Sequence, residues 1–128
     1  MVEHSGEHRG GLNLKRGGLL PISALARWLA IAMGDVRGST PDRLSRAAAA
    51  GLLTADEAET LTGAFRDVYE LLLRQEVAAI RAGKPFSNWI APRDLDTLTR
   101  RHLRDSFRAI SAVQAQIEGG WKTRMAPT

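Results

Sequence analysis

One stretch decides how this chain folds, and it reads Asn13-Leu14-Lys15-Arg16-Gly17-Gly18-Leu19-Leu20-Pro21-Ile22. Two cations come first, a glycine pair follows, and a proline then opens an apolar segment that continues to Met33. Glycine turns the backbone readily at positive φ, and proline is favoured in the first turn of a helix because its missing N–H costs nothing there. The stretch therefore predicts a turn at Gly17-Gly18 and a helix that begins near Pro21.

A helix that begins at this position would suit an anion. Its first N–H groups have no partner within the helix, its N-terminal dipole is positive, and Lys15 and Arg16 would lie beside it. Free backbone N–H groups and cations together are what phosphate-binding helix starts present. The alternative interpretation is a basic loop followed by an ordinary core helix, which is a common arrangement. The residues alone leave both interpretations open.

Apolar periodicity defines the predicted first helix. Apolar residues recur on one face at helical spacing, and they are Ile22, Leu25, Ala26, Leu29 and Met33. Arg27 lies roughly 140° from that face and is predicted to face solvent or a partner surface. Gly34 is predicted to end the helix.

Caps and stops predict the second and third helices. Thr40 is the predicted N-cap of a second helix that ends at Gly51. The sequence Thr54-Ala55-Asp56-Glu57 is a capping box, and the third helix that it opens is predicted to continue to about Ala82.

The fourth helix is predicted to begin after Asp96 and to run from about Thr97 to Glu118, where Gly119-Gly120 would break it. Gln114 is polar within its apolar seam and is either hydrogen-bonded across the bundle or a site residue. No segment has the period of a strand. The predicted fold is an all-α antiparallel bundle of four to five helices with one long central helix. We expect residues 1–12 to be a tail or linker, 13–121 to be the bundle and 122–128 to be a second tail.

Composition favours a cytoplasmic globular domain. The 128 residues contain no Cys, and no apolar run approaches the ~18–20 residues that a membrane span needs. The N-terminus lacks the basic-then-apolar order of a secretory signal. Residues 51–80 carry two Lys/Arg against six Asp/Glu, while 1–50 carry seven against four and 81–128 carry nine against four. This pattern suits charge pairing within the molecule, and the seven aromatic residues are few for a nucleic-acid-binding surface, so we do not expect nucleic acid as a partner.

Two motifs resemble metal-binding or catalytic patterns and are interpreted otherwise. His4-Ser5-Gly6-Glu7-His8 has the H-x-x-E-H order of inverted zinc peptidases, but its internal glycine does not suit the stable helix that such a site needs. Gly38-Ser39 and Asp94-Leu95-Asp96 are the residue types with which nucleotidyltransferases hold a triphosphate and two metal ions, but they lie about 55 residues apart instead of roughly a dozen. We therefore expect no catalytic residue and no metal ligand in this chain.

Several blocks along the chain occur, in the same order, in one known family. They are the run from Leu14 to Ile22 with Leu25-Ala26-Arg27, Thr40 with Arg43-Leu44, Arg74-Gln75, Asn88-Trp89-Ile90 with Pro92 and Leu95, and the set Leu103, Phe107, Ile110 and Gln114. On these blocks, the chain resembles the nucleotidyltransferase substrate-binding domain over about residues 8–121. The first block is the most specific, and Asn13 stands where the family more often has Asp.

The resemblance implies a helical domain that lies C-terminal to a nucleotidyltransferase domain. Such proteins often also carry cyclic-nucleotide-binding and paired CBS domains and act in signal transduction, and similar helical regions follow the catalytic domain in the uridylyltransferases of nitrogen regulation. The catalytic Gly-Ser and paired Asp would belong to the preceding domain. We expect Mg with a nucleoside triphosphate for the parent protein and no cofactor for this chain.

The expected function is that of a non-catalytic module that packs on the preceding nucleotidyltransferase domain of the same chain and helps to bind the nucleotide or the acceptor, which could be a protein. The predicted substrate-binding residues are Lys15, Arg16, Gly17, Gly18, Arg27 and Arg43. The alternative is a dimerisation or protein-interaction module in signalling that touches no substrate and forms a homodimer.

Overall fold

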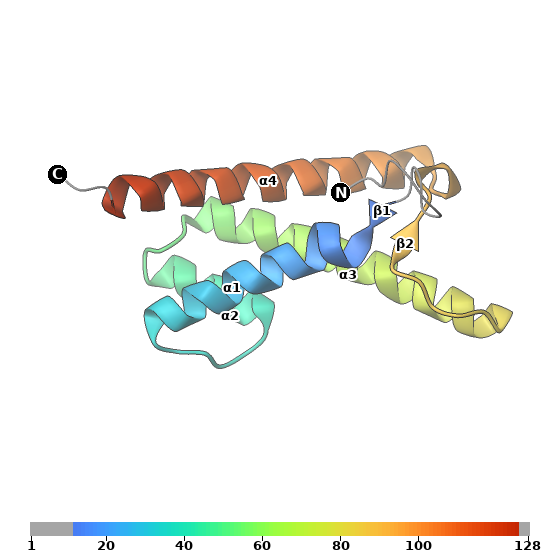
Figure 1. Cartoon of the computed structure of the whole chain (residues 1–128), viewed down its shortest axis with the longest axis horizontal. Helices are drawn as coiled ribbons and strands as arrows, with labels where there is room; N and C mark the ends of the chain where they lie inside the picture. The colour runs from blue at the N-terminus through green and yellow to red at the C-terminus, as the bar shows by residue number, and fades with distance from the viewer. Residues whose placement is uncertain (1–11, 126–128) are drawn as a thin grey trace.

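The computed structural model describes residues 12–125 and shows a bundle of long helices (Figure 1). The α-helices of this part of the chain are α1 (Leu20–Met33), α2 (Thr40–Ala49), α3 (Ala55–Ala82) and α4 (Thr97–Met125). The structure is 79% helical with four helices, so the predicted all-α fold with one long helix is confirmed. α3 and α4 run antiparallel, since the start of α3 and the end of α4 lie toward the same side of the molecule (Figure 1).

Short elements complete the described structure. They are β1 (Leu12–Asn13), the π-helix η1 (Lys15–Leu19), β2 (Trp89–Ile90) and the 3-10 helix η2 (Pro92–Asp94). β1 and β2 form an antiparallel pair in which Leu12 aligns with Ile90 and Asn13 aligns with Trp89. The sequence did not predict this pair, because two residues are too few to show the alternation of a strand. The pair joins the segment before η1 to the segment after α3.

The core lies on both sides of α3. α1 packs on α2, α2 packs on α3, and α3 packs on α4, while η1 contacts both α3 and α4. The buried side chains of α1 come from its predicted apolar face. The buried set includes Ile22, Ala26 and Leu29 of α1, Leu61, Val68 and Leu72 of α3, and Leu103, Phe107 and Ile110 of α4. Each helix therefore buries one stripe of 3.6-residue period. Gln114 is half-buried in the α4 stripe, and its side chain has no hydrogen bond to another described residue, so residues 12–125 do not supply the bond across the bundle that was one of the two alternatives for it.

Most predicted helix ends are confirmed. Gly34 (φ 73°) ends α1 and Gly83 (φ 65°) ends α3, both in the left-handed conformation that glycine adopts without strain. Thr54 caps α3, where its side chain accepts from the Glu57 N–H and the Glu57 side chain accepts from the Thr54 N–H. These ends follow from local sequence alone.

Carboxylates take part in the caps of α2 and α4. The cap of α2 is Ser39 and not the predicted Thr40, since the Ser39 hydroxyl accepts from the Asp42 N–H and the Asp42 carboxylate accepts from the Ser39 N–H. In α4, the Asp96 carboxylate accepts from the Thr99 N–H at 2.7 Å. These backbone hydrogen bonds lower the pKa of Asp42 and the pKa of Asp96 below the usual range. The start of each helix therefore depends on an ionised side chain.

One predicted helix end is wrong. α4 does not stop at Gly119-Gly120 but continues to Met125, past the bundle boundary predicted at residue 121. Glycine destabilises a helix by about 1 kcal/mol relative to alanine but does not forbid it. The next proline in the sequence is Pro127, so no stronger helix breaker lies nearer.

α3 and α4 both extend beyond the rest of the bundle, in opposite directions (Figure 1). The projecting turns of α3 leave Leu73, Val77 and Ile80 exposed, at 44%, 46% and 71%. Despite these apolar side chains, none of the described helices is apolar over enough length to cross a membrane.

Candidate functional site

The glycine pair of the opening stretch lies inside a helix and not in a turn before it. Gly17 and Gly18 are buried in η1, and neither has a positive φ. α1 begins at Leu20, one residue before the predicted start near Pro21, but η1 leads directly into it and the Leu20 N–H donates to the Lys15 carbonyl. The predicted turn at Gly17-Gly18 is therefore wrong, and the start of α1 is not the free helix end that was predicted.

Close packing explains why glycine stands in η1. A Cβ atom on Gly18 would lie 2.9 Å from Val68 Cγ1 and 3.2 Å from Phe107 Cε1, which is closer than carbon atoms normally approach. η1 therefore reaches α3 and α4 because Gly18 has no side chain. π-Helical turns are rare and occur frequently at functional sites. The presence of Lys15 and Arg16 in this turn makes it the candidate site.

Hydrogen bonds hold the start of η1 in place. The Arg16 N–H donates to Asn13 Oδ1 at 2.9 Å, and Asn13 is buried. The Leu14 N–H donates to the Asn88 carbonyl at 2.9 Å, beside the β1–β2 pair. Lys15 and Arg16 are exposed, so the backbone is fixed while the two charged side chains face solvent.

Segments that are far apart in sequence meet at this end of the bundle. Gln75 of α3 donates through Nε2 to the Trp89 carbonyl of β2 at 3.5 Å. β2 in turn pairs with β1, which leads into η1. Three of the blocks that carry the family resemblance, 14–22, 74–75 and 88–90, therefore form one connected structure.

The structure does not bring the predicted substrate-binding residues together. Lys15 and Arg16 are exposed at the start of η1, with Gly17 and Gly18 buried after them. Arg27 is exposed, as predicted, but a helical stretch of a dozen residues places it about 18 Å from Lys15 along the axis. The cations of the opening stretch and Arg27 are thus separate parts of one helical surface.

Arg43 lies near the other end of α1 and braces a loop. Its guanidinium donates to the Val36 carbonyl in the connection between α1 and α2. Arg46 donates to the Arg37 carbonyl of the same loop. The Arg37 guanidinium, hydrogen-bonded to Asp35, holds the pKa of that carboxyl well below its usual range. The contacts of Arg43 therefore belong to this loop and not to η1.

The other motifs have separate outcomes. Ser39 and Asp96, from the rejected Gly-Ser and Asp pair, are the helix caps described above. The motif from His4 to His8 lies outside the described residues. Residues 12–125 hold no group of three or more His, Cys, Asp or Glu side chains that could bind a metal ion.

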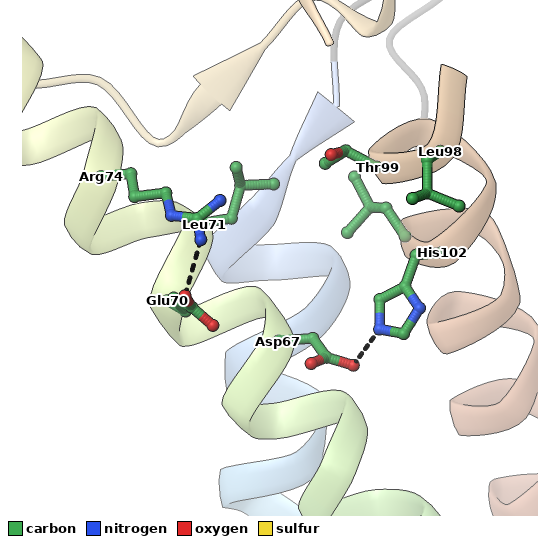
Figure 2. A pocket seen from close by; sticks show the side chains of 8 residues that line it. Asp67, Glu70, Leu71, Arg74, Leu98, Thr99 and His102 are labelled. Atoms are coloured by element: carbon green, nitrogen blue, oxygen red, sulfur yellow. Dashed lines mark hydrogen bonds and ion pairs between the residues drawn. The ribbon is translucent and has the colours of Figure 1, made fainter. Parts of the chain in front are cut away.

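A pocket between α3 and α4 was not predicted from the sequence (Figure 2). Its volume is about 350 Å³. The wall from α3 consists of Asp67, Glu70, Leu71 and Arg74, and the wall from α4 consists of Leu98, Thr99, His102 and Leu103. The spacing of residues 67, 70, 71 and 74 indicates that the α3 wall lies on one helix face. The local sequence does not indicate which other segment faces this wall.

A hydrogen bond between two helices and an ion pair within one helix line this pocket (Figure 2). His102 Nε2 lies 2.7 Å from Asp67 Oδ2 and joins α4 to α3. Arg74 Nη2 lies 2.7 Å from Glu70 Oε1, one turn away on α3. The Arg74 and Glu70 side chains are 68% and 63% exposed, so this pair adds little to stability. The pocket therefore presents charged groups that are accessible from solvent.

A family model described as "Putative nucleotidyltransferase substrate binding domain" matches residues 1–119 of the chain. No curated protein and no solved structure matches the chain. A function is inferred from the family match, the η1 turn and the α3–α4 pocket.

Proposed function

This chain belongs to the nucleotidyltransferase substrate-binding domain family, and we propose that it is a non-catalytic helical module that packs on the catalytic domain of its parent protein and helps to bind the nucleotide. The observation that carries this proposal is the start of η1. There, Lys15 and Arg16 are exposed on a backbone that the Asn13–Arg16 hydrogen bond and the close packing of Gly18 hold in place.

The chemistry of a nucleoside triphosphate fits this arrangement. Its phosphates carry negative charge, and cations beside a helix N-terminus are common phosphate ligands. η1 and α1 follow each other without a break, so the positive dipole end of the combined helix lies at Lys15 and Arg16. In the parent protein, the catalytic domain would supply the carboxylates that hold Mg²⁺. This module would add positive charge on another side of the triphosphate, in the cytoplasm.

The predicted substrate-binding residues would then have different roles. Lys15 and Arg16 would contact the phosphates, and the buried Gly17 and Gly18 would position them without touching the nucleotide. Arg27 would contact the catalytic domain or the acceptor farther along the same surface. Arg43 braces the α1–α2 loop and is not part of the proposed contact.

The test is the substitution of each cation in the full-length protein. Lys15→Ala and Arg16→Ala should each raise the KM for the nucleotide about ten- to a hundredfold, because a charge-assisted hydrogen bond to phosphate is lost. The free energy of unfolding should change by less than about 0.5 kcal/mol, since both side chains are exposed. Arg66→Ala is the matched control, because Arg66 is an exposed arginine of α3 with no ion pair among the described residues.

Steady-state kinetics and thermal melting decide whether Lys15 and Arg16 bind phosphate or stabilise the fold. A rise in KM with an unchanged melting temperature supports the proposal. Unchanged KM in both variants contradicts phosphate binding by η1, and a large fall in melting temperature shows that the two cations are structural.

A second candidate function is a dimerisation or protein-interaction module that touches no substrate. The exposed Leu73, Val77 and Ile80 on the projecting end of α3 favour it, because contiguous exposed apolar side chains mark interaction surfaces. A solution mass of two chains that returns to one chain in Val77→Glu would support this candidate. A monomeric mass at all concentrations would contradict the homodimer.

A further inference from the structure

We propose that the pocket between α3 and α4 binds the purine base of the nucleotide. This proposal rests on the proposed function, because it takes the nucleotide to be a ligand of this module. It adds the part of the nucleotide that the pocket recognises and the residues that recognise it.

The pocket offers both hydrogen-bond acceptors and donors. Asp67 uses one carboxylate oxygen in its hydrogen bond to His102, and Glu70 uses one in its ion pair with Arg74, which leaves the second oxygen of each to accept. Arg74 bonds to Glu70 through Nη2 only, so its other N–H groups remain to donate. A ligand that matches these groups carries donors and acceptors side by side on one edge, as a nucleobase does.

Apolar side chains supply the surface that a flat ring requires. Leu71 and Leu103 line the pocket, and Leu98 at its edge is 76% exposed, the largest exposed fraction among the large apolar side chains described. A ring placed against Leu98 would remove part of this apolar surface from water, which is favourable at about 25 cal/mol per Å². The pocket thus combines apolar walls with a few polar groups, as small-molecule sites usually do.

Size and polarity together favour guanine among the bases. The volume of about 350 Å³ lies in the range of roughly 300–1,000 Å³ that is usual for small-molecule pockets, so a purine with part of its ribose has room. Guanine has N–H groups that donate hydrogen bonds to a carboxylate. It also has the acceptors O6 and N7, to which an arginine donates two hydrogen bonds. Asp67, Glu70 and Arg74 provide that combination from a single face of α3.

Opening the Arg74–Glu70 ion pair for a ligand costs little. An i,i+4 pair on a helix surface contributes only about 0.2–0.5 kcal/mol, and the Arg74–Glu70 pair is of this exposed kind. The pocket is also built on the same two helices that hold η1. Val68 follows Asp67 in α3, Phe107 follows Leu103 by one turn in α4, and both contact Gly18. The base site and the proposed phosphate site therefore share one rigid support.

The experiment is an NMR titration of the 128-residue chain, without Mg²⁺. The probes are guanosine, uridine and inorganic tripolyphosphate, each added separately. Guanosine should shift the amides of Asp67, Arg74 and Thr99 saturably, and uridine should bind more weakly. Arg74→Met and Asp67→Asn should each weaken guanosine binding about tenfold. Arg66→Met, on the same helix outside the pocket, should leave it unchanged.

The three probes separate this proposal from the phosphate site. Tripolyphosphate that shifts Lys15 and Arg16, with no response to guanosine, overturns the base site and leaves the phosphate site standing. Guanosine that binds the pocket, with no response of η1 to tripolyphosphate, supports the base site and contradicts the role of the two cations. Equal guanosine affinity in the wild type, Arg74→Met and Asp67→Asn also overturns the proposal, because guanosine would then bind outside this pocket.

Discussion

The opening segment, residues 12–19, and the later helix ends use the same residue types in different ways. Gly18 is buried in η1 against Val68 and Phe107 and has no positive φ, whereas Gly83 at the end of α3 has a φ of 65° and open space around it. The start of η1 is held by the neutral amide of Asn13, which accepts from the Arg16 N–H, whereas carboxylates accept backbone N–H groups at the starts of α2 and α4. A glycine or a cap therefore shows its role only when its neighbours from other elements are known.

The largest expected effect tests whether Gly18 is a packing glycine. Gly18→Val should lower the free energy of unfolding by about 3 kcal/mol, because the added side chain overlaps Val68 and Phe107. Urea unfolding of the 128-residue chain measures it. The double variant with Val68→Ala should recover part of the loss. A Gly18→Val chain as stable as the parent would show that η1 is not tightly packed. The difference in role between Gly18 and Gly83 would then not hold.

A smaller loss is expected where glycine serves conformation. Gly83→Ala should lower the free energy of unfolding by about 1 kcal/mol, since alanine is strained in the left-handed region. Gly83→Asn is the control, because asparagine tolerates this conformation and should cost less. Equal losses in both variants would mean that the strain is not the cause.

Replacing a glycine that serves neither close packing nor a positive φ should raise the free energy of unfolding. Gly63 lies inside α3 without a positive φ, and a Cβ added there meets no atom within 4 Å. Gly63→Ala should raise the free energy of unfolding by about 0.5–1 kcal/mol, because alanine is the better helix former. The same urea measurement applies, and destabilisation would show that α3 has a neighbour at this position in solution.

The smallest expected effect distinguishes the two kinds of cap by pH. The lowered pKa values of Asp42 and Asp96 mean that their contribution to stability is present above the ordinary value of about 3.9 and is lost as the pH falls below it, through the lowered values. Asn13 does not titrate. Amide-exchange protection of the Thr99 N–H should therefore fall as the pH is lowered below about 3.9, while protection of the Arg16 N–H persists. Loss at both amides together would indicate global unfolding instead.

The helices were predictable because their signals are local. The apolar stripe of α1, the capping box at Thr54 and the stops at Gly34 and Gly83 each lie within a few residues of the feature they specify. The error at the cap of α2 was one residue, since Ser39 and Thr40 have the same chemistry.

The site was less predictable because its contacts are not local. Gly18 has a packing role because Val68 and Phe107 lie against it. The glycine pair alone does not indicate which residues will be its neighbours. The pocket likewise requires Asp67 and His102 to face each other from two helices. Lys15 and Arg16 are exposed beside the start of η1, and their role in substrate binding stays a prediction.

The β1–β2 pair and the Gly18 contacts also set an order of events during protein synthesis. Gly18 packs against Val68 and Phe107, and Phe107 is synthesised about 90 residues after Gly18, which takes about 4.5–18 s at about 5–20 residues per second. Until then, Gly18 lacks one of its two native neighbours.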